Sequence, residues 1–427
     1  MTTKILIQSK QPYLTPSTRD LRLDLLKGYF ILRMLVDHSA GYSILHWAIG
    51  GTGFLVSGAE GFLFLSGLLA GIVYFRIINK SGLGEGVNKA ASRFINLYLI
   101  ALTASLIFMF ISEHFHLRWA RELSMSLPIP LVINTMTHKL SYPYTEILQV
   151  YALFFLFLPL ILVFLEKGKK RVILAVSVVF YLAYLISPRA GNFPVLTNDG
   201  NFINFSAAQL LMVIGLLIGY APYEENKFLT RPIPKLWLII AAVGAILTIF
   251  FFYLIKNPLA AATFGLTSED LRWISTKAFS KANLGPARLA AFFCFFIVLF
   301  HLTTRFWYRV NQWLGWLLLP LGQFSLQAYL IHLPLILISS LIYQSTDLPR
   351  NNQWANLITS TLTVGIAWWI TRKQWLTPTP RTKRWLFFVP GIVIVLFIGI
   401  ETIYRLPGFY AGLREVFSMI QAAMRVQ

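Results

Sequence analysis

The segment 24–47 carries more ionisable side chains than a membrane anchor needs. It reads DLLKGYFILRMLVDHSAGYSILHW and contains Lys27, Arg33, Asp37 and His38 within an otherwise apolar stretch. A charged group inside a transmembrane helix costs several kcal/mol unless it is paired or solvated. We therefore treat these residues as candidates for chemistry: a histidine can act as a general base, and cations can bind an anionic ligand.

Helical spacing predicts which of these residues can contact each other and which only share a helix face. Asp24 and Lys27 are three positions apart and Arg33 and Asp37 are four apart, so each pair is predicted to meet on one face. Lys27 and His38 are eleven positions apart and share a face, but about 16 Å separates them along a helix axis. We expect these two to line one path across the membrane without touching.

A second apolar segment, SGAEGFLFLSGLLAG at 57–71, supplies an intramembrane carboxylate, Glu60. Glu60 and His38 are predicted to lie at matching depths below the outer surface, about seven residues from the helix ends that face each other. A carboxylate beside an imidazole fixes its tautomer and raises its basicity. We predict His38 as general base and Glu60 as its orienting partner. Asp37 is the other candidate for this catalytic role, but it is adjacent to His38 and points about 100° away around the helix, so Glu60 is the better partner. A buried pair that only stabilises the bundle stays open.

The same segment has a face of small residues, and a later segment has a polar stripe. The small residues favour close helix packing, a substrate channel, or both: Gly58, Gly61, Ser66, Gly67 and Gly71. The later segment, LPLGQFSLQAYLIHLPLI, places Ser325, Tyr329 and His332 at i, i+4 and i+7. This stripe is predicted either to complete the site or to form an interhelical hydrogen-bond cluster.

Composition indicates an integral membrane protein independently of these motifs. The 427 residues are 56% hydrophobic and 13% charged, whereas soluble domains carry about 25% charged residues. We predict an all-α polytopic transmembrane bundle of about 10–12 spans. Apolar runs of bilayer length lie at 25–45, 53–78, 93–112, 146–166, 171–188, 206–221, 236–255, 286–303, 316–343, 354–371 and 385–404.

The charge of the chain is distributed as expected for a multi-pass membrane protein. Its net charge of +20 comes from Lys and Arg concentrated in alternate loops, which predicts a cytoplasmic N-terminus and argues against nucleic acid as a partner. The longer outer segments, 113–145, 189–205 and 256–285, are rich in aromatic and amide side chains that suit a carbohydrate: Trp119, Tyr142, Tyr144, Asn192, Asn198, Asp199, Asn201, Asn204 and Trp273.

The domain organisation is predicted to be simple. A cytoplasmic segment 1–20 precedes a single transmembrane domain at 21–404 and a C-terminal tail at 405–427. With one cysteine, Cys294, no intramolecular disulfide is expected. The scattered histidines do not have the spacing of a metal site, so none is predicted.

Two segments resemble a known family of membrane proteins. TRDLRLDLLKGYFILRMLVDHSAG, followed by SGAEGFLFLSGLLAGIVYFR, is similar to OpgC-type proteins, which succinylate periplasmic glucans and belong to the wider acyltransferase-3-like superfamily. LGQFSLQAYLIHLPL resembles a late span of that superfamily. The superfamily pattern of a basic residue, ten positions and a histidine is met by Lys27 and His38. A second pattern, two arginines three apart, is met only by Arg93, since Asn96 occupies the other position.

The resemblance implies an O-acyltransferase of the inner (plasma) membrane. It uses acyl-CoA as substrate, needs no cofactor, and moves a succinyl or acetyl group to a glycan hydroxyl. Donor-binding candidates are Lys27, Arg33, Arg76, Arg93 and Ser66, and acceptor or neighbouring candidates are Tyr329, His332 and Ser325. Partners are thus lipid, acyl-CoA and a glycan. Two alternatives remain: a proton-coupled transporter or flippase, whose buried charges would relay protons, and a catalytically inactive relative.

Overall fold

A computed structural model describes residues 12–15, 19–39, 41–51, 55–117, 128–140, 142–188, 203–346, 349, 351–374, 389–398, 400 and 419. Several side chains predicted to face an acceptor lie outside these residues: Trp119, Asn192, Asn198, Asp199 and Asn201. Most of the predicted tail 405–427 also lies outside them.

The described chain folds into helices, and its only recorded β-pairing is an isolated bridge between Leu14 and Asp20. The longer helices are α2 (Leu21–Ser39), α4 (Gly58–His114), α6 (Glu146–Glu166), α7 (Lys170–Ile186), α8 (Phe205–Gly219), α10 (Lys235–Lys256), α13 (Pro286–Arg305), α16 (Ser325–Ser345) and α17 (Gln353–Arg372). Shorter ones are α3 (Ile44–Ala48), α5 (Pro128–Met136), α9 (Lys227–Thr230), α11 (Pro258–Thr263), α12 (Ser268–Trp273), α14 (Trp307–Val310) and α15 (Trp316–Gln323).

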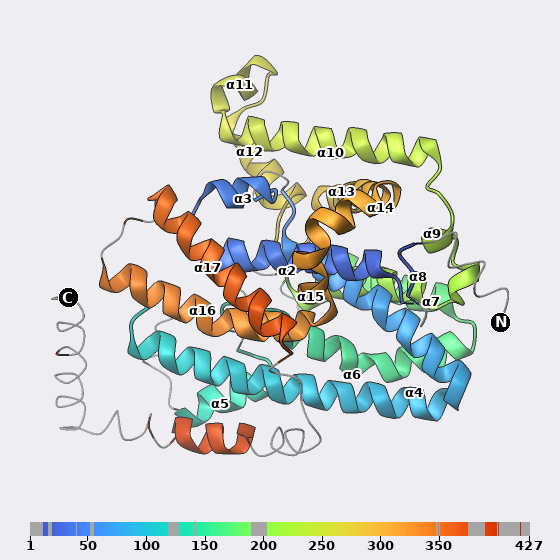
Figure 1. The fold of residues 1–427 in the computed structure, drawn as a ribbon, viewed down its shortest axis with the longest axis horizontal. Coiled ribbons are helices and arrows are strands. Elements are labelled where there is room, and N and C mark those ends of the chain that lie inside the picture. Colours follow the sequence, from blue (N-terminus) through green and yellow to red (C-terminus); the bar gives the residue numbers. More distant parts are fainter. Residues whose placement is uncertain are drawn as a thin grey trace.

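Among these described helices, α4, α6, α10, α13 and α16 are long and apolar enough to cross a membrane. The predicted all-α transmembrane bundle is therefore confirmed (Figure 1). Helix α2 has 19 residues but carries too many charges to meet the same criterion. A short apolar helix, Val389–Ile398, occupies part of the last predicted span.

Helix α4 contains both the second and the third predicted span. Its two arms run back along each other and join at Gly82, whose φ of 83° and ψ of 166° lie in a region that side chains with a Cβ avoid. The predicted span 316–343 is instead broken into α15 and α16 at Phe324. This break places Ser325 at the start of α16.

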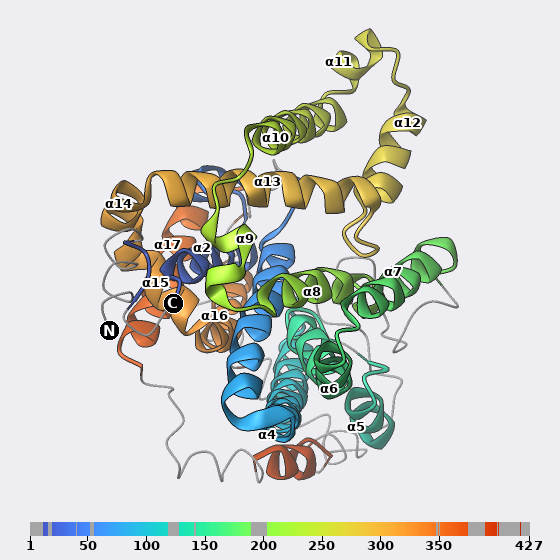
Figure 2. The same cartoon turned by 90° about the vertical axis from the view of Figure 1, so that its right-hand side faces the viewer.

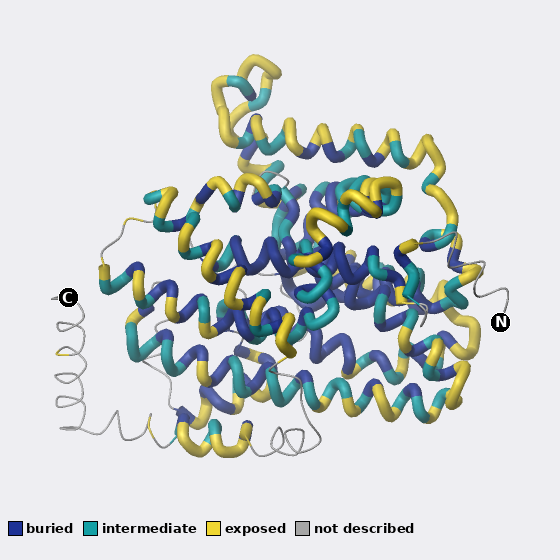
Figure 3. The backbone as a smooth tube through the Cα atoms, viewed as in Figure 1, coloured by how far each residue is buried: buried dark blue, intermediate teal, exposed yellow. Residues whose placement is uncertain are grey.

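Helix α2 is the centre of the bundle. It packs against α4, α13, α15, α16 and α17, and 15 of its 19 residues are buried (Figure 3). Its contact with α15 depends on two glycines: a Cβ on Gly28 would lie 1.9 Å from the Leu318 carbonyl oxygen, and one on Gly322 would lie 1.7 Å from that of Asp24. Backbones can approach this closely only where side chains are absent.

The first arm of α4 contacts α8 through a second set of glycines. A Cβ on Gly67 would lie 2.0 Å from the Met212 carbonyl oxygen, and one on Gly215 would lie 2.2 Å from that of Phe64. Gly71 and Gly219 repeat the arrangement one turn further along. The packing interpretation of the small-residue face is thus confirmed.

We expect Gly215→Ala to destabilise the detergent-solubilised protein by about 1–3 kcal/mol, because the backbone of α4 or α8 must move to admit the methyl group. A lower thermal unfolding midpoint would show this loss of stability. Gly84→Ala is the matched control. Gly84 lies in the same helical hairpin, and a Cβ there meets nothing within 4 Å, so this variant should be neutral or slightly stabilised. Equal midpoints for the two variants would contradict the packing argument.

Candidate active site

Two histidines from helices far apart in sequence face each other inside the bundle. The Nδ1 atom of His38, in the last turn of α2, lies 3.1 Å from the Nε2 atom of His332 on α16. Their rings are 5.4 Å apart between centroids, and the Tyr144 ring packs edge-on against His38 at 5.0 Å. The polar stripe on α16 therefore meets His38 through an interhelical hydrogen bond, which is compatible with both of its predicted roles.

The hydrogen-bond acceptors around His38 and His332 determine which of their ring nitrogens carry a hydrogen. The Nδ1 atom of His332 lies 2.5 Å from the Tyr329 carbonyl oxygen, which can only accept, so Nδ1 carries the hydrogen. In neutral His332 the Nε2 atom is then an acceptor, and His38 must donate to it from Nδ1. The remaining nitrogen of His38, Nε2, is left unprotonated and has no hydrogen-bond partner among the described residues. It is positioned as a general base.

Tyr329 supports this site through its hydroxyl. It is buried and donates a hydrogen bond to the backbone oxygen of Tyr144 at 2.5 Å. Tyr144 has a φ of 67°, unusual for a residue with a side chain. The Tyr329 hydroxyl thus holds the backbone that carries the Tyr144 ring. Ser325 lies one turn before Tyr329 on α16 and is also buried.

The predicted contact between Glu60 and His38 is wrong. One Glu60 carboxylate oxygen accepts from Nε of Arg288 on α13, and the other accepts from the backbone N–H and hydroxyl of Ser57. Glu60 is fully buried, and both of its oxygens are used in capping α4 and binding α13. His332, and not Glu60, is the residue hydrogen-bonded to His38.

The expected pairs within α2 are also wrong. Asp24 pairs with Arg19, with 2.6 Å between Oδ2 and Nε, so it does not bind Lys27. Asp37 lies 3.2 Å from Nδ1 of His46 on α3. Arg33 donates through Nη2 to the backbone oxygens of Gly51 and Val56. Asp37 therefore holds α3 against α2 and does not contact His38.

Lys27 lies in a second cluster, toward the N-terminal end of α2. It is buried, its Nζ atom stands 5.0 Å over the Phe62 ring, and it forms no ion pair with a described residue. Lys27 and Arg93 both act electrostatically on the Tyr151 hydroxyl, which Ser66 also faces. Three of the five predicted donor-binding residues, Lys27, Ser66 and Arg93, are thus brought together.

Phe62 joins the two clusters. Its ring lies 5.9 Å from that of Tyr151 on one side and stacks on that of Tyr329 at 6.3 Å on the other. The Tyr329 ring is in turn 4.6 Å from His332. Ring contacts through Phe62, Tyr329 and His332 therefore connect Lys27 to His38. The path along their shared helix face stays a prediction.

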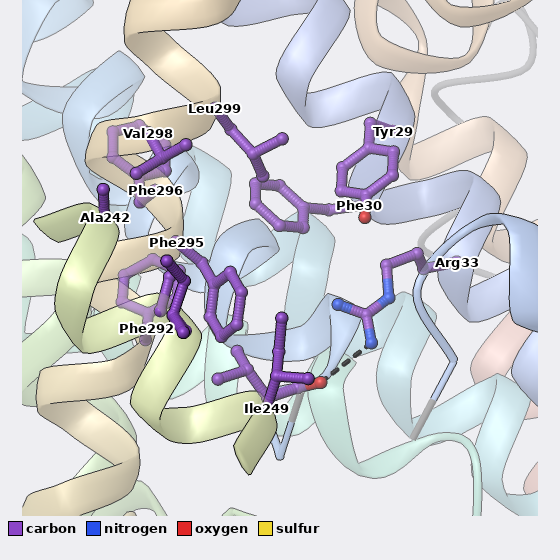
Figure 4. A pocket seen from close by; sticks show the side chains of 13 residues that line it. Tyr29, Phe30, Arg33, Ala242, Ile249, Phe292, Phe295, Phe296, Val298 and Leu299 are labelled. Atoms are coloured by element: carbon purple, nitrogen blue, oxygen red, sulfur yellow. Dashed lines mark hydrogen bonds between the residues drawn. The ribbon is translucent and has the colours of Figure 1, made fainter. Parts of the chain in front are cut away.

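The other two predicted donor-binding residues lie elsewhere. Arg33 borders an apolar cavity of about 330 Å³ between α2, α10 and α13, where phenylalanines and aliphatic side chains form most of the wall (Figure 4). Arg76 is exposed and lines a separate hollow of about 170 Å³ beside Tyr223 and Glu224. Neither position contacts the line from Lys27 to His38.

Several residues of the site were missed in the sequence. Arg288, two positions after Pro286, was read as part of an apolar span, although an arginine there needs a buried partner. Tyr151 lies in the second turn of α6, in a run that is otherwise largely apolar.

Comparison with known proteins gives one match. The family described as OpgC protein matches residues 19–375, which is most of the chain and contains both clusters. No curated protein and no solved structure matches.

Glu60→Gln should destabilise the fold by about 3–5 kcal/mol, because it leaves the Arg288 guanidinium buried without its counter-ion. Thermal unfolding of the purified protein measures this. Glu85→Gln is the matched control: the Glu85–Lys89 pair on the same helix is 3.1 Å long but exposed, and removing it should cost at most about 0.5 kcal/mol. A Glu60→Gln midpoint that follows the control would show that the pair does not hold α4 to α13.

Proposed function

The chain belongs to the OpgC protein family, and we propose on this basis that it is a membrane-bound O-acyltransferase. It moves a succinyl or acetyl group from acyl-CoA to a hydroxyl of an extracytoplasmic glycan. It works in the inner membrane with its N-terminus in the cytoplasm. The observation that supports this best is the hydrogen-bonded series from the Tyr329 carbonyl through His332 to His38, which leaves His38 Nε2 as a base.

The reaction balances with the groups of this site. His38 Nε2 takes the proton from the acceptor hydroxyl while that oxygen attacks the thioester carbonyl carbon. The tetrahedral intermediate collapses, the C–S bond breaks, and the coenzyme A thiolate leaves. The imidazolium returns the proton to the thiolate, so that the products are an ester and free coenzyme A. His332 accepts from His38 Nδ1 throughout and stabilises the positive charge that forms on the ring.

The second cluster suits the donor. Coenzyme A carries phosphates, and Lys27 and Arg93 are cations at the end of the line opposite His38. Lys27 lies about 16 Å from His38 along α2, so a cation there binds a distant part of the donor and takes no part in bond making. The Tyr151 and Ser66 hydroxyls offer hydrogen bonds beside it.

His38→Ala should reduce acyl transfer by a factor of about 10² to 10⁴, because no other described group replaces the base. The assay uses purified protein in liposomes, succinyl-CoA or acetyl-CoA, and a glucan acceptor, with the ester detected by mass spectrometry. His301→Gln, on α13 and without a recorded hydrogen bond, is the control and should retain activity. Unchanged transfer by His38→Ala would refute the proposal, and proton-coupled transport without ester formation would support the transporter alternative.

His332 is a positioning residue, and its variants distinguish orientation from packing. His332→Gln keeps an acceptor for His38 Nδ1 and should retain a substantial part of the activity. His332→Leu fills similar space without an acceptor and should lose about as much as His38→Ala, since His38 can then adopt the wrong tautomer. Equal activities for the two variants would mean that His332 has only a packing role.

Lys27→Met should raise KM for the acyl-CoA donor by about tenfold or more while changing kcat little, because the lost interaction is the same in ground and transition states. Steady-state kinetics at varied acyl-CoA concentration test this. Lys80→Met, an exposed lysine of the α4 turn, is the control for a general loss of positive charge. A fall in kcat at unchanged KM would place Lys27 in the chemical step instead.

A further inference from the structure

The cavity of about 330 Å³ between α2, α10 and α13 has no part in the proposed reaction. Helix α10 packs mainly on α13, and Figure 2 shows α13 lying between α10 and α2. Side chains of all three helices line the cavity. Its volume is at the lower end of the range of about 300–1,000 Å³ that small-molecule sites have. The fold therefore contains a second hollow of the size of a ligand site.

The cavity lies at membrane depth and opens toward lipid. Helices α10 and α13 are both long and apolar enough to cross a membrane, and their lining residues fall within 242–249 and 292–299, in the middle of each helix. Ile246 and Ile249 line the cavity although they are 65% and 43% exposed. Exposed side chains in the middle of a membrane-spanning helix face hydrocarbon. A molecule that enters the cavity from this side is therefore a lipid.

One side of the cavity is polar. Arg33 is buried, and among the described residues that line the cavity it alone is charged. Its Nη2 atom donates to the backbone oxygens of Gly51 and Val56 at 2.6 and 2.8 Å. These acceptors are neutral, so the guanidinium keeps its positive charge. Tyr29 also lines the cavity, and its hydroxyl donates to the Ile49 oxygen at 2.9 Å. The segment before α4 thus holds both polar side chains in place.

The opposite side of the cavity is apolar. Figure 4 shows Arg33 facing the phenylalanines of α13 across the cavity, with Ile249 of α10 beside them. A hydrocarbon chain between Phe292, Phe295 and Ile249 would contact them through dispersion along its length. The cavity therefore combines a wall for an acyl chain with one fixed cation.

These two parts match the two parts of an anionic phospholipid. The planar guanidinium of arginine suits phosphate, and basic pockets between transmembrane helices bind anionic headgroups. A zwitterionic phospholipid has the same phosphate, but its own ammonium compensates that charge. A net negative headgroup is therefore the better partner for Arg33.

We propose that this cavity binds one anionic phospholipid of the surrounding membrane, with an acyl chain between α10 and α13 and its phosphate at Arg33. The bound lipid links α10 to the central helix α2. Because Arg33 is apart from the line from Lys27 to His38, this site is independent of the proposed acyl transfer.

The test measures which lipids the protein retains. The protein is reconstituted in nanodiscs of equal parts phosphatidylglycerol and phosphatidylcholine, released, and analysed by native mass spectrometry. The wild type should retain one phospholipid and prefer phosphatidylglycerol by about fivefold or more, the effect of one basic side chain on an anionic lipid. Arg33→Gln keeps an N–H donor for the oxygens of Gly51 and Val56 but removes the charge, so it should retain the two lipids about equally.

Ala245→Phe tests the part that holds the acyl chain and leaves Arg33 in place. Ala245 is buried and lines the cavity, so the added ring takes the space of the chain, and retention of both lipids should be lost. Val243→Phe is the matched control. Val243 lies on the same helix, is exposed and does not line the cavity, so this variant should retain lipid like the wild type.

Three results would overturn the proposal. A wild type that retains both lipids in their bulk ratio would show that Arg33 does not select the headgroup. Retention by Ala245→Phe at the wild-type level, with equal unfolding midpoints in phosphatidylcholine alone, would show that the lipid binds elsewhere on the surface. A retained fatty acid in place of a phospholipid, identified by its mass, would refute the assignment of a phosphate to Arg33. None of these measurements depends on ester formation, so the proposed function stands or fails separately.

Discussion

The cost of burying charge in the central helix governs the rest of this structure. Each ionisable side chain of α2 must be paired, solvated or used. Arg22 binds Asp20 and lies between the rings of Tyr13 and Phe300. Other charges are satisfied in the same local way: Asp24 by Arg19, Arg33 by loop carbonyls, and Asp37 by His46. Among the residues that the structure describes, Lys27 has no ion pair and His38 Nε2 has no hydrogen bond, so these two groups are the ones left for a ligand. On α2, the charged side chains with a structural role are therefore those that have a partner within the protein.

Close backbone contacts then decide where those remaining groups point. Gly28 and Gly322 let α15 approach α2, and α16 follows after one non-helical residue. This connection brings His332 within 3.1 Å of His38. On the other side, the glycines between α4 and α8 fix the arm that carries Phe62 and Ser66. Small residues therefore act at a distance on the chemistry, because they set the rotation and spacing of the helices that bear it.

Features that depend on a single helix, such as which residues share a face, could be predicted from the sequence. Contacts between residues of two helices could not. The all-α bundle, the shared face of Lys27 and His38 on α2, and the stripe of Tyr329 and His332 on α16 follow from hydropathy and helical period. Of the predicted spans, the described residues contain five helices long and apolar enough to cross a membrane, and the predicted span 316–343 is broken into α15 and α16. The pairing of Glu60 with His38 failed for a physical reason. The 1.5 Å rise per residue gives the depth of a side chain, whereas its direction depends on how each helix is rotated in the bundle. Glu60 pairs with Arg288 on α13.

The aromatic layer between the two clusters adds a constraint on any substrate that occupies both. The Phe62 ring lies 5.0 Å from the Lys27 ammonium and stacks on the Tyr329 ring at 6.3 Å, so the contacts that join the two clusters are made by uncharged rings. A charged ligand part would lose its hydration there without gaining a counter-ion. Acyl-CoA has the matching order of parts, with phosphates at one end, a long uncharged arm and the thioester at the other. On the proposed function, Lys27 binds the phosphates while the uncharged arm passes Phe62 toward His38. The aromatic layer would thereby keep the site that binds the donor's phosphates apart from the site where its thioester reacts.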